Sequence, residues 1–196
     1  MSERAHLCVF LGSSNRAAPV YFEAARAVGA ALVENGLSLV YGGAKVGLMG
    51  ALADAVLAAG GEARGVIPRQ LFDKEVAHEG LTELHVVDSM HERKVKMYEI
   101  SDAFLALPGG FGTFEELFEI TTWAQLGMHQ KPIGVLDVNG YYAPLRALAD
   151  GAVDAGLVAA EHRQILLFGE DPASLVAQLK THQAPHFDKL IGREET

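Results

Sequence analysis

The feature that most constrains the fold is the regular alternation of short apolar runs with longer, often alanine-rich stretches. The apolar runs do not alternate strictly with polar residues, which is typical of parallel strands buried on both faces. They cover residues 7–11, 37–41, 63–67, 84–87, 103–107, 133–136 and 165–168. Helical character is found between and after them, at residues 21–34, 48–59, 90–100, 113–126, 142–155 and 172–180. This order predicts a three-layer α/β fold, a Rossmann-like doubly wound parallel sheet of about seven strands.

The length and composition fit one compact domain over residues 1–196, with a frayed polar tail at 191–196. Hydrophobic residues make up 49% of the chain and charged residues 21%, as in globular rather than disordered proteins. The 16 basic and 25 acidic residues give a formal charge of −9. This sign is opposite to that of most duplex-binding proteins, so no nucleic-acid partner is expected.

Cellular location is indicated by the absence of targeting and membrane signals. No apolar run approaches the roughly 20 residues that span a bilayer, and the beginning of the chain does not resemble a secretory leader. The single cysteine, Cys8, lies in an apolar run and is expected to be a buried thiol. We therefore expect a soluble cytoplasmic protein that does not interact with membranes.

The chain has 21 glycines, and several of them form clusters directly after predicted strands. Three such clusters contain Gly12, the pair Gly42 and Gly43, and the run 109–112. Since the carboxyl ends of parallel strands meet at one edge of the sheet, the three clusters should lie near one another. This edge is where doubly wound sheets bind their ligands.

The segment 107–116 reads LPGGFGTFEE and carries the strongest functional signal. Its glycines allow a sharp turn, and the helix that follows offers free N–H groups to an anion such as a nucleotide phosphate. It matches neither the Walker loop nor the dinucleotide fingerprint. A structural alternative is a capping box, with Thr113 as N-cap and Glu116 at the third helical position.

Three further segments have a functional and a structural interpretation. Residues 41–50, YGGAKVGLMG, again place glycines between a strand and a helix, and residues 12–15, GSSN, form a polar loop suited to phosphate or sugar. Residues 89–96, SMHERKVK, combine a capping box of Ser89 and Glu92 with three cations. A plain helix entry, an ordinary polar loop and a solvated basic turn are the respective alternatives.

Metal and hydrolase motifs are missing from the sequence. His91-Glu92 lacks the second histidine of a zinc-binding helix, and the other histidines show no ligand spacing. A serine-hydrolase elbow is also absent. We therefore predict no metal site.

Taken together, the segments 108–116, 89–94, 41–50 and 121–127 resemble the LONELY GUY family. The first resembles its PGGxGTxxE signature, and the resemblance extends over residues 7–168. Members are cytokinin riboside 5′-monophosphate phosphoribohydrolases, also labelled possible lysine decarboxylases. The resemblance implies a homodimer that hydrolyses the N-glycosidic bond of an adenine nucleoside monophosphate, without a metal or other cofactor.

The resemblance also implies functional residues, with Arg93 and Glu116 as the catalytic pair. Expected substrate contacts are Glu75, Arg93, Lys94, Gly110, Phe111, Gly112, Thr113, Phe114, Glu115, Glu116 and Thr122. Gly12, Ser13, Gly43 and Met90, from the companion segments, complete the predicted binding set. Glu116 would be ionised by its place near a helix N-terminus, and would stabilise positive charge on the ribose or activate water.

Several alternatives remain open from the sequence. A non-catalytic nucleotide sensor or carrier would need the same pocket. A pyridoxal-phosphate decarboxylase is disfavoured because no lysine is placed as a Schiff-base residue, and a dinucleotide oxidoreductase because the glycine spacing is wrong. The sequence does not choose between adenosine monophosphate and N6-prenylated nucleotides.

Overall fold

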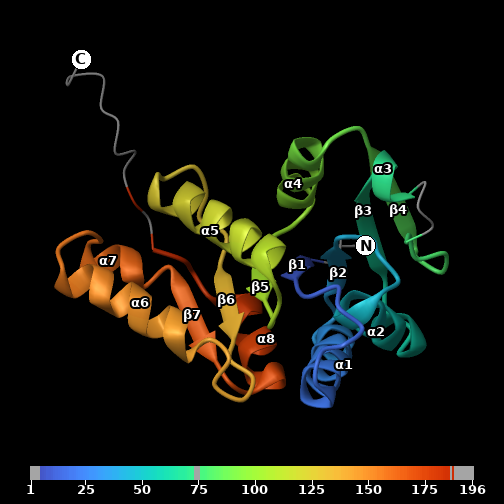
Figure 1. Cartoon of the computed structure of the whole chain (residues 1–196), viewed down its shortest axis with the longest axis horizontal. Coiled ribbons are helices and arrows are strands. Elements are labelled where there is room, and N and C mark those ends of the chain that lie inside the picture. The colour runs from blue at the N-terminus through green and yellow to red at the C-terminus, as the bar shows by residue number, and fades with distance from the viewer. Residues whose placement is uncertain (1–4, 73–75, 186, 188–196) are drawn as a thin grey trace.

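The computed structural model describes residues 5–72, 76–185 and 187, and its centre is one parallel sheet. The sheet has seven strands in the order β4-β3-β2-β1-β5-β6-β7, as Figure 1 shows. The strands are β1 (His6–Phe10), β2 (Ser38–Tyr41), β3 (Ala63–Pro68), β4 (Glu83–Val87), β5 (Ala103–Ala106), β6 (Ile133–Leu136) and β7 (Leu166–Gly169). The predicted doubly wound α/β fold is confirmed.

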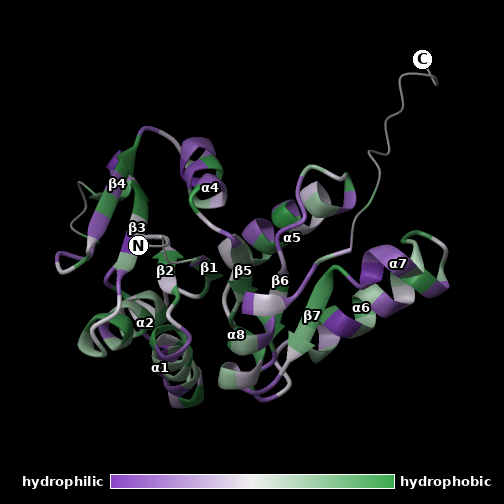
Figure 2. Cartoon of the chain, turned by 180° about the vertical axis from the view of Figure 1, so that it is seen from behind, coloured by the Kyte–Doolittle hydropathy of each residue, from purple (hydrophilic) through white to green (hydrophobic). Residues whose placement is uncertain are grey.

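Helices cover both faces of the sheet and enclose two separate cores. On one face, α1 (Pro19–Glu34), α2 (Gly47–Ala58) and α8 (Pro172–Thr181) bury side chains such as Val28 and Leu52. On the other face, α4 (Met90–Glu99), α5 (Phe111–Gln125) and α6 (Ala143–Asp154) pack around Phe104 and Leu117. In Figure 2 these helices carry both hydrophilic and hydrophobic residues, as expected for helices that cover one face of a sheet.

The helix boundaries differ from the predicted ones in informative places. α1 begins at Pro19, since proline suits the first helical turn. α5 begins at Phe111 rather than at residue 113, because Gly110 already adopts the extended conformation of an N-cap. Two short helices, α3 (Arg69–Phe72) and α7 (Ala160–Arg163), were not predicted.

The strand order places the functional loops side by side. The chain leaves β4 at one edge and returns to β5 beside β1, so the winding reverses between β1 and β5. The loops after these two strands are joined by a hydrogen bond from the Gly12 N–H to the Pro108 carbonyl (3.2 Å). Such a reversal point is the ligand-binding crevice of doubly wound sheets.

In the described residues, no helix is both long enough and apolar enough to cross a bilayer.

Candidate active site

A cavity of about 440 Å³ opens at the carboxyl ends of β1, β2 and β5. All three glycine clusters reach it, together with α4 and the first turns of α5. Its lining residues are Leu11, Gly12, Ser13, Gly42, Ala44, Val46, Met49, Leu71, Val76, Met90, Arg93, Gly110, Phe111, Gly112, Thr113, Glu115 and Glu116. The predicted meeting of the three clusters at one edge of the sheet is confirmed.

Arg93 of α4 and Glu116 of α5 form a buried ion pair in the wall of this cavity. Arg93 Nη2 donates to Glu116 Oε1 at 3.1 Å, and each residue is only 7% exposed. Among the described residues, Arg93 Nε has no hydrogen-bond partner and Nη1 reaches only the Met90 sulfur, at 3.9 Å. A buried guanidinium with unused donors in a cavity wall is suited to bind a polar ligand.

Gly42 makes room for this arginine. A Cβ atom at this position would overlap Arg93 Nη2 and lie 3.2 Å from its Cζ. The guanidinium therefore lies directly over the end of β2, in space that only glycine leaves open. Gly42 was not among the predicted site residues, since a glycine beside a strand gives no sign of what lies above it.

The Glu116 carboxyl has its pKa raised to about 6. Burial is the largest cause, and the positive charge of Arg93 opposes it. The expected ionised form at neutral pH is compatible with this pKa, but loss of water makes ionisation harder despite the favourable charges nearby. At pH 7 roughly nine in ten of these groups are still ionised.

The first turn of α5 lines the cavity and contains backbone N–H groups that the helix itself does not use. Gly110 is the N-cap and has no side chain to occupy them, so the N–H groups of Phe111, Gly112 and Thr113 have no partner within the helix. The structural alternative, a capping box with Thr113 as N-cap, is therefore wrong. Thr113 is buried at the third helical position, and Glu116 lies almost a turn further along.

The glycine turn is held from behind by two tyrosines that the sequence did not single out. The hydroxyl of Tyr141 donates to the Gly109 carbonyl, and that of Tyr142 donates to the Leu107 carbonyl at 2.8 Å. Gly109 is also packed against Thr113, whose Cβ would be 2.7 Å from a Cβ added at Gly109. The backbone of the turn is thus fixed on two sides.

The side chains of the basic segment at the start of α4 have different partners. Ser89 Oγ accepts from the Glu92 N–H at 3.1 Å, as predicted, whereas the Glu92 carboxylate accepts from Asp88 N–H rather than from Ser89. Lys94 points to α5 and donates to Glu115 and, at 2.9 Å, to Glu119. Of the two adjacent cations, only Arg93 reaches the cavity.

The predicted binding residues are only partly brought together. Ten of them line the cavity: Gly12, Ser13, Met90, Arg93, Gly110, Phe111, Gly112, Thr113, Glu115 and Glu116. Gly43, Lys94, Phe114 and Thr122 do not line it, and Glu75 falls outside the described residues. Thr122 instead donates to the Phe118 carbonyl of its own helix (2.7 Å).

The sequence did not predict four apolar residues that line the cavity, Val46, Met49, Leu71 and Val76. Isolated apolar side chains resemble core residues in a sequence.

No group of three or more His, Cys, Asp or Glu side chains suited to a metal ion is found in the described ranges.

Comparison with known proteins places this geometry in a family. The family model described as "Possible lysine decarboxylase" matches residues 49–179. The cytokinin riboside 5′-monophosphate phosphoribohydrolase LOG7 of Arabidopsis thaliana is 46% identical over 95% of this chain and 86% of its own length. The chain belongs to the LONELY GUY family. Another relative is the cytokinin riboside 5′-monophosphate phosphoribohydrolase LOG of Oryza sativa subsp. japonica. It is 45% identical over 90% of this chain and 73% of its own length.

Solved structures of similar fold lie further away in sequence. A molybdenum cofactor binding protein from Rippkaea orientalis matches with a TM-score of 0.70 at 19% identity, covering 92% of this chain and 98% of its own. The molybdenum cofactor carrier protein of Chlamydomonas reinhardtii matches at 0.66 and 20% identity, covering 91% and 97%. At these identities the two solved structures show a similar fold and nothing further about this chain.

Proposed function

We propose that this protein is a phosphoribohydrolase that hydrolyses cytokinin riboside 5′-monophosphates to the free base and ribose 5-phosphate. The observation that carries the proposal is the buried pair of Arg93 and Glu116, 3.1 Å apart, beside the open first turn of α5. The relatives named above are enzymes of this name and share the larger part of their length with this chain.

The phosphate is held where the backbone offers donors. The first-turn N–H groups of α5 and the Ser13 hydroxyl face one part of the cavity, and a helix N-terminus favours an anion. With the phosphate there, the ribose lies near Glu116, because side chains in a helix lean toward its N-terminus.

Glu116 and Arg93 have different roles in the proposed reaction. Cleavage of the bond between C1′ and the base builds positive charge on the ribose, which the Glu116 carboxylate stabilises. Glu116 also takes a proton from the water that attacks C1′. The unused donors of Arg93 orient the nucleotide or compensate negative charge on the leaving base.

The base and its N6 substituent occupy the apolar part of the cavity. Val46, Met49, Leu71, Val76 and Met90 line this part. Val46 follows β2, Met49 belongs to α2, Leu71 to α3 and Met90 to α4, and Val76 lies between α3 and β4. An adenine without a substituent would leave apolar surface uncovered there, which favours N6-prenylated nucleotides over adenosine monophosphate.

We propose a cytoplasmic homodimer that associates through the outer surfaces of α4 and α5. Val95 of α4 is 45% exposed, Phe118 of α5 is 46% exposed, and Met90 is 47% exposed at the start of α4. Large apolar side chains gathered on one surface favour association with a second copy. The single cysteine, Cys8, is a buried free thiol, in keeping with a reducing compartment.

The function is tested by incubating pure protein with N6-isopentenyladenosine 5′-monophosphate and separately with adenosine monophosphate. We expect stoichiometric release of base and ribose 5-phosphate, with the higher kcat/KM for the prenylated nucleotide. Tight binding of either nucleotide with no release of base would contradict the proposal and favour a carrier.

A further inference from the structure

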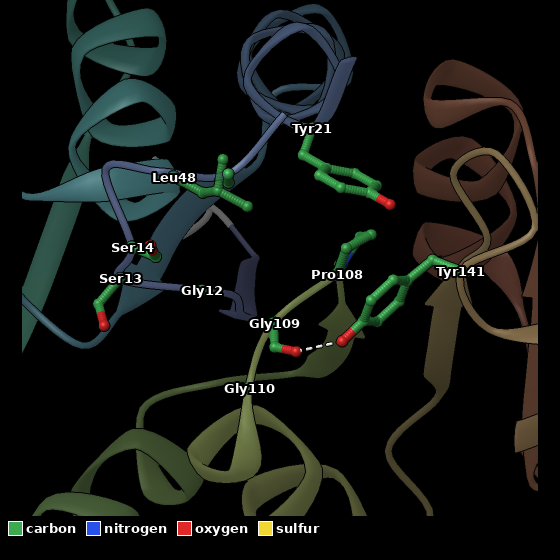
Figure 3. Close-up of a pocket in the computed structure, with 10 residues that line it drawn as sticks. Gly12, Ser13, Ser14, Tyr21, Leu48, Pro108, Gly109, Gly110 and Tyr141 are labelled. Atoms are coloured by element: carbon green, nitrogen blue, oxygen red, sulfur yellow. Dashed lines mark hydrogen bonds between the residues drawn. The ribbon is translucent and has the colours of Figure 1, made fainter. Parts of the chain in front are cut away.

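A second cavity, of about 340 Å³, lies behind the glycine turn and is not used by the proposed reaction. Figure 3 shows it between Tyr21 of α1, Tyr141 after β6, and the loops that carry Ser13 and Gly109. The two tyrosine rings meet edge to face with their centroids 5.8 Å apart. We call this space the tyrosine cavity; its lining is Gly12, Ser13, Ser14, Ala17, Tyr21, Leu48, Pro108, Gly109, Gly110 and Tyr141.

The tyrosine cavity and the substrate cavity are neighbours that share part of a wall. Gly12, Ser13 and Gly110 line both. Ser13 and Gly110 belong to the region that holds the phosphate in the proposed function. A phosphate bound there is therefore placed at the boundary between the two spaces, with the nucleoside on one side and the tyrosine cavity on the other.

The chemistry of the tyrosine cavity selects against charge. None of its lining residues is Lys, Arg or His. The hydroxyls of Ser13, Ser14 and Tyr21 in the lining are uncharged, and that of Tyr141 is already used by the Gly109 carbonyl. Leu48, Pro108 and the tyrosine rings offer apolar surface, so a second phosphate would lose water there without gaining a cation.

From this arrangement we propose that the tyrosine cavity is a subsite for an uncharged, flat group esterified to the 5′-phosphate of the nucleotide. The substrate class thus extends from 5′-monophosphates to 5′-phosphodiesters with an aromatic ester group. The diester bond stays intact; water adds at C1′, the N-glycosidic bond breaks, and the products are the base and the 5-phosphoester of ribose. This inference rests on the proposed placement of the phosphate.

The test compares three nucleotides of N6-isopentenyladenosine: the 5′-monophosphate, its phenyl ester and the 5′-diphosphate. We expect kcat/KM for the phenyl ester to stay within about threefold of that for the monophosphate. The diphosphate should be at least about tenfold poorer, since its extra charge meets no cation. A phenyl ester that is hydrolysed no better than the diphosphate would overturn the proposal.

Tyr21 supplies the matched variants. Tyr21→Ala should lower kcat/KM for the phenyl ester about fivefold through lost ring contact, and leave the monophosphate unchanged. Tyr21→Phe should behave like the unaltered protein, because the ring and not the hydroxyl makes the contact. An equal effect of Tyr21→Ala on both substrates would overturn the subsite. Failure to hydrolyse the monophosphate at all would instead overturn the proposed function, so the two failures are distinguishable.

Discussion

At the scale of single residues, the proposed chemistry depends on how strongly Glu116 is buried. Its ion pair with Arg93 favours ionisation, yet burial prevails and raises the pKa to about 6. The result is a carboxyl group that is mostly ionised at neutral pH but easily protonated below it. A base that accepts a proton during catalysis works best with a pKa in this range.

The pH dependence of the reaction follows from this pKa. In the proposed reaction the Glu116 carboxyl must be ionised to act, so kcat/KM should be level above pH 7 and fall about tenfold per unit well below pH 6. Arg93→Met removes the charge that lowers this pKa, so the remaining activity should fall off at a higher pH. Rate measurements between pH 4.5 and 8.5 check both; an unmoved profile in Arg93→Met would contradict the coupling.

Gly42 provides a test of the position of Arg93. Gly42→Ala places a methyl group on the space of the guanidinium, so Arg93 must move away from Glu116, and we expect kcat to fall roughly 10- to 100-fold. Gly151→Ala is the matched control, since a Cβ there meets nothing within 4 Å, and it should keep full activity. Normal turnover by Gly42→Ala would show that the pair tolerates displacement.

At the scale of elements, the first turn of α5 separates glycines needed for packing from glycines needed for binding. A Cβ at Gly109 would overlap Thr113 and lie 3.0 Å from Gly12 N, whereas one at Gly112 would meet nothing within 4 Å. The two glycines are three residues apart in one motif, so the motif does not distinguish their roles.

Alanine substitutions at Gly109 and Gly112 should therefore have different effects on stability. Gly109→Ala should destabilise the fold by roughly 1–3 kcal/mol. Gly112→Ala should leave the melting temperature unchanged or raised, since alanine is the better helix former, but should raise KM because its methyl group lies where the phosphate approaches. Thermal denaturation and steady-state kinetics check the pair; an unchanged KM for Gly112→Ala would argue against phosphate binding at this turn.

The elements also show what the sequence can and cannot predict. The strands were predictable because their apolar residues are contiguous, and the glycine turns because they follow strands. The start of α5 was not, since Thr113 and Glu116 fit a capping box that the Gly110 N-cap displaces. The hydrogen bond from the Tyr141 hydroxyl to the Gly109 carbonyl was not predicted, because the two residues are 32 positions apart in the chain. Only the strand order brings them together.

At the scale of the whole molecule, the arrangement of exposed apolar residues predicts the oligomeric state. Phe118 on α5 lies on the proposed dimer surface, whereas Leu148 on α6 is 66% exposed on another helix. A chain of 21.0 kDa should therefore sediment with about twice that mass. Phe118→Glu should shift the equilibrium toward the monomer and Leu148→Glu should not, as analytical ultracentrifugation would detect. A dimer that persists in Phe118→Glu would place the interface elsewhere.

The most direct test of the account is the substitution Glu116→Gln, which keeps the size of the side chain and an oxygen for Arg93 while removing its ability to become a base. We expect the variant to fold and to bind N6-isopentenyladenosine 5′-monophosphate with a dissociation constant within a few-fold of that of the unaltered protein. Its release of free base should fall by roughly 100-fold or more. Release of base at the normal rate by the folded variant would contradict the central role given to Glu116.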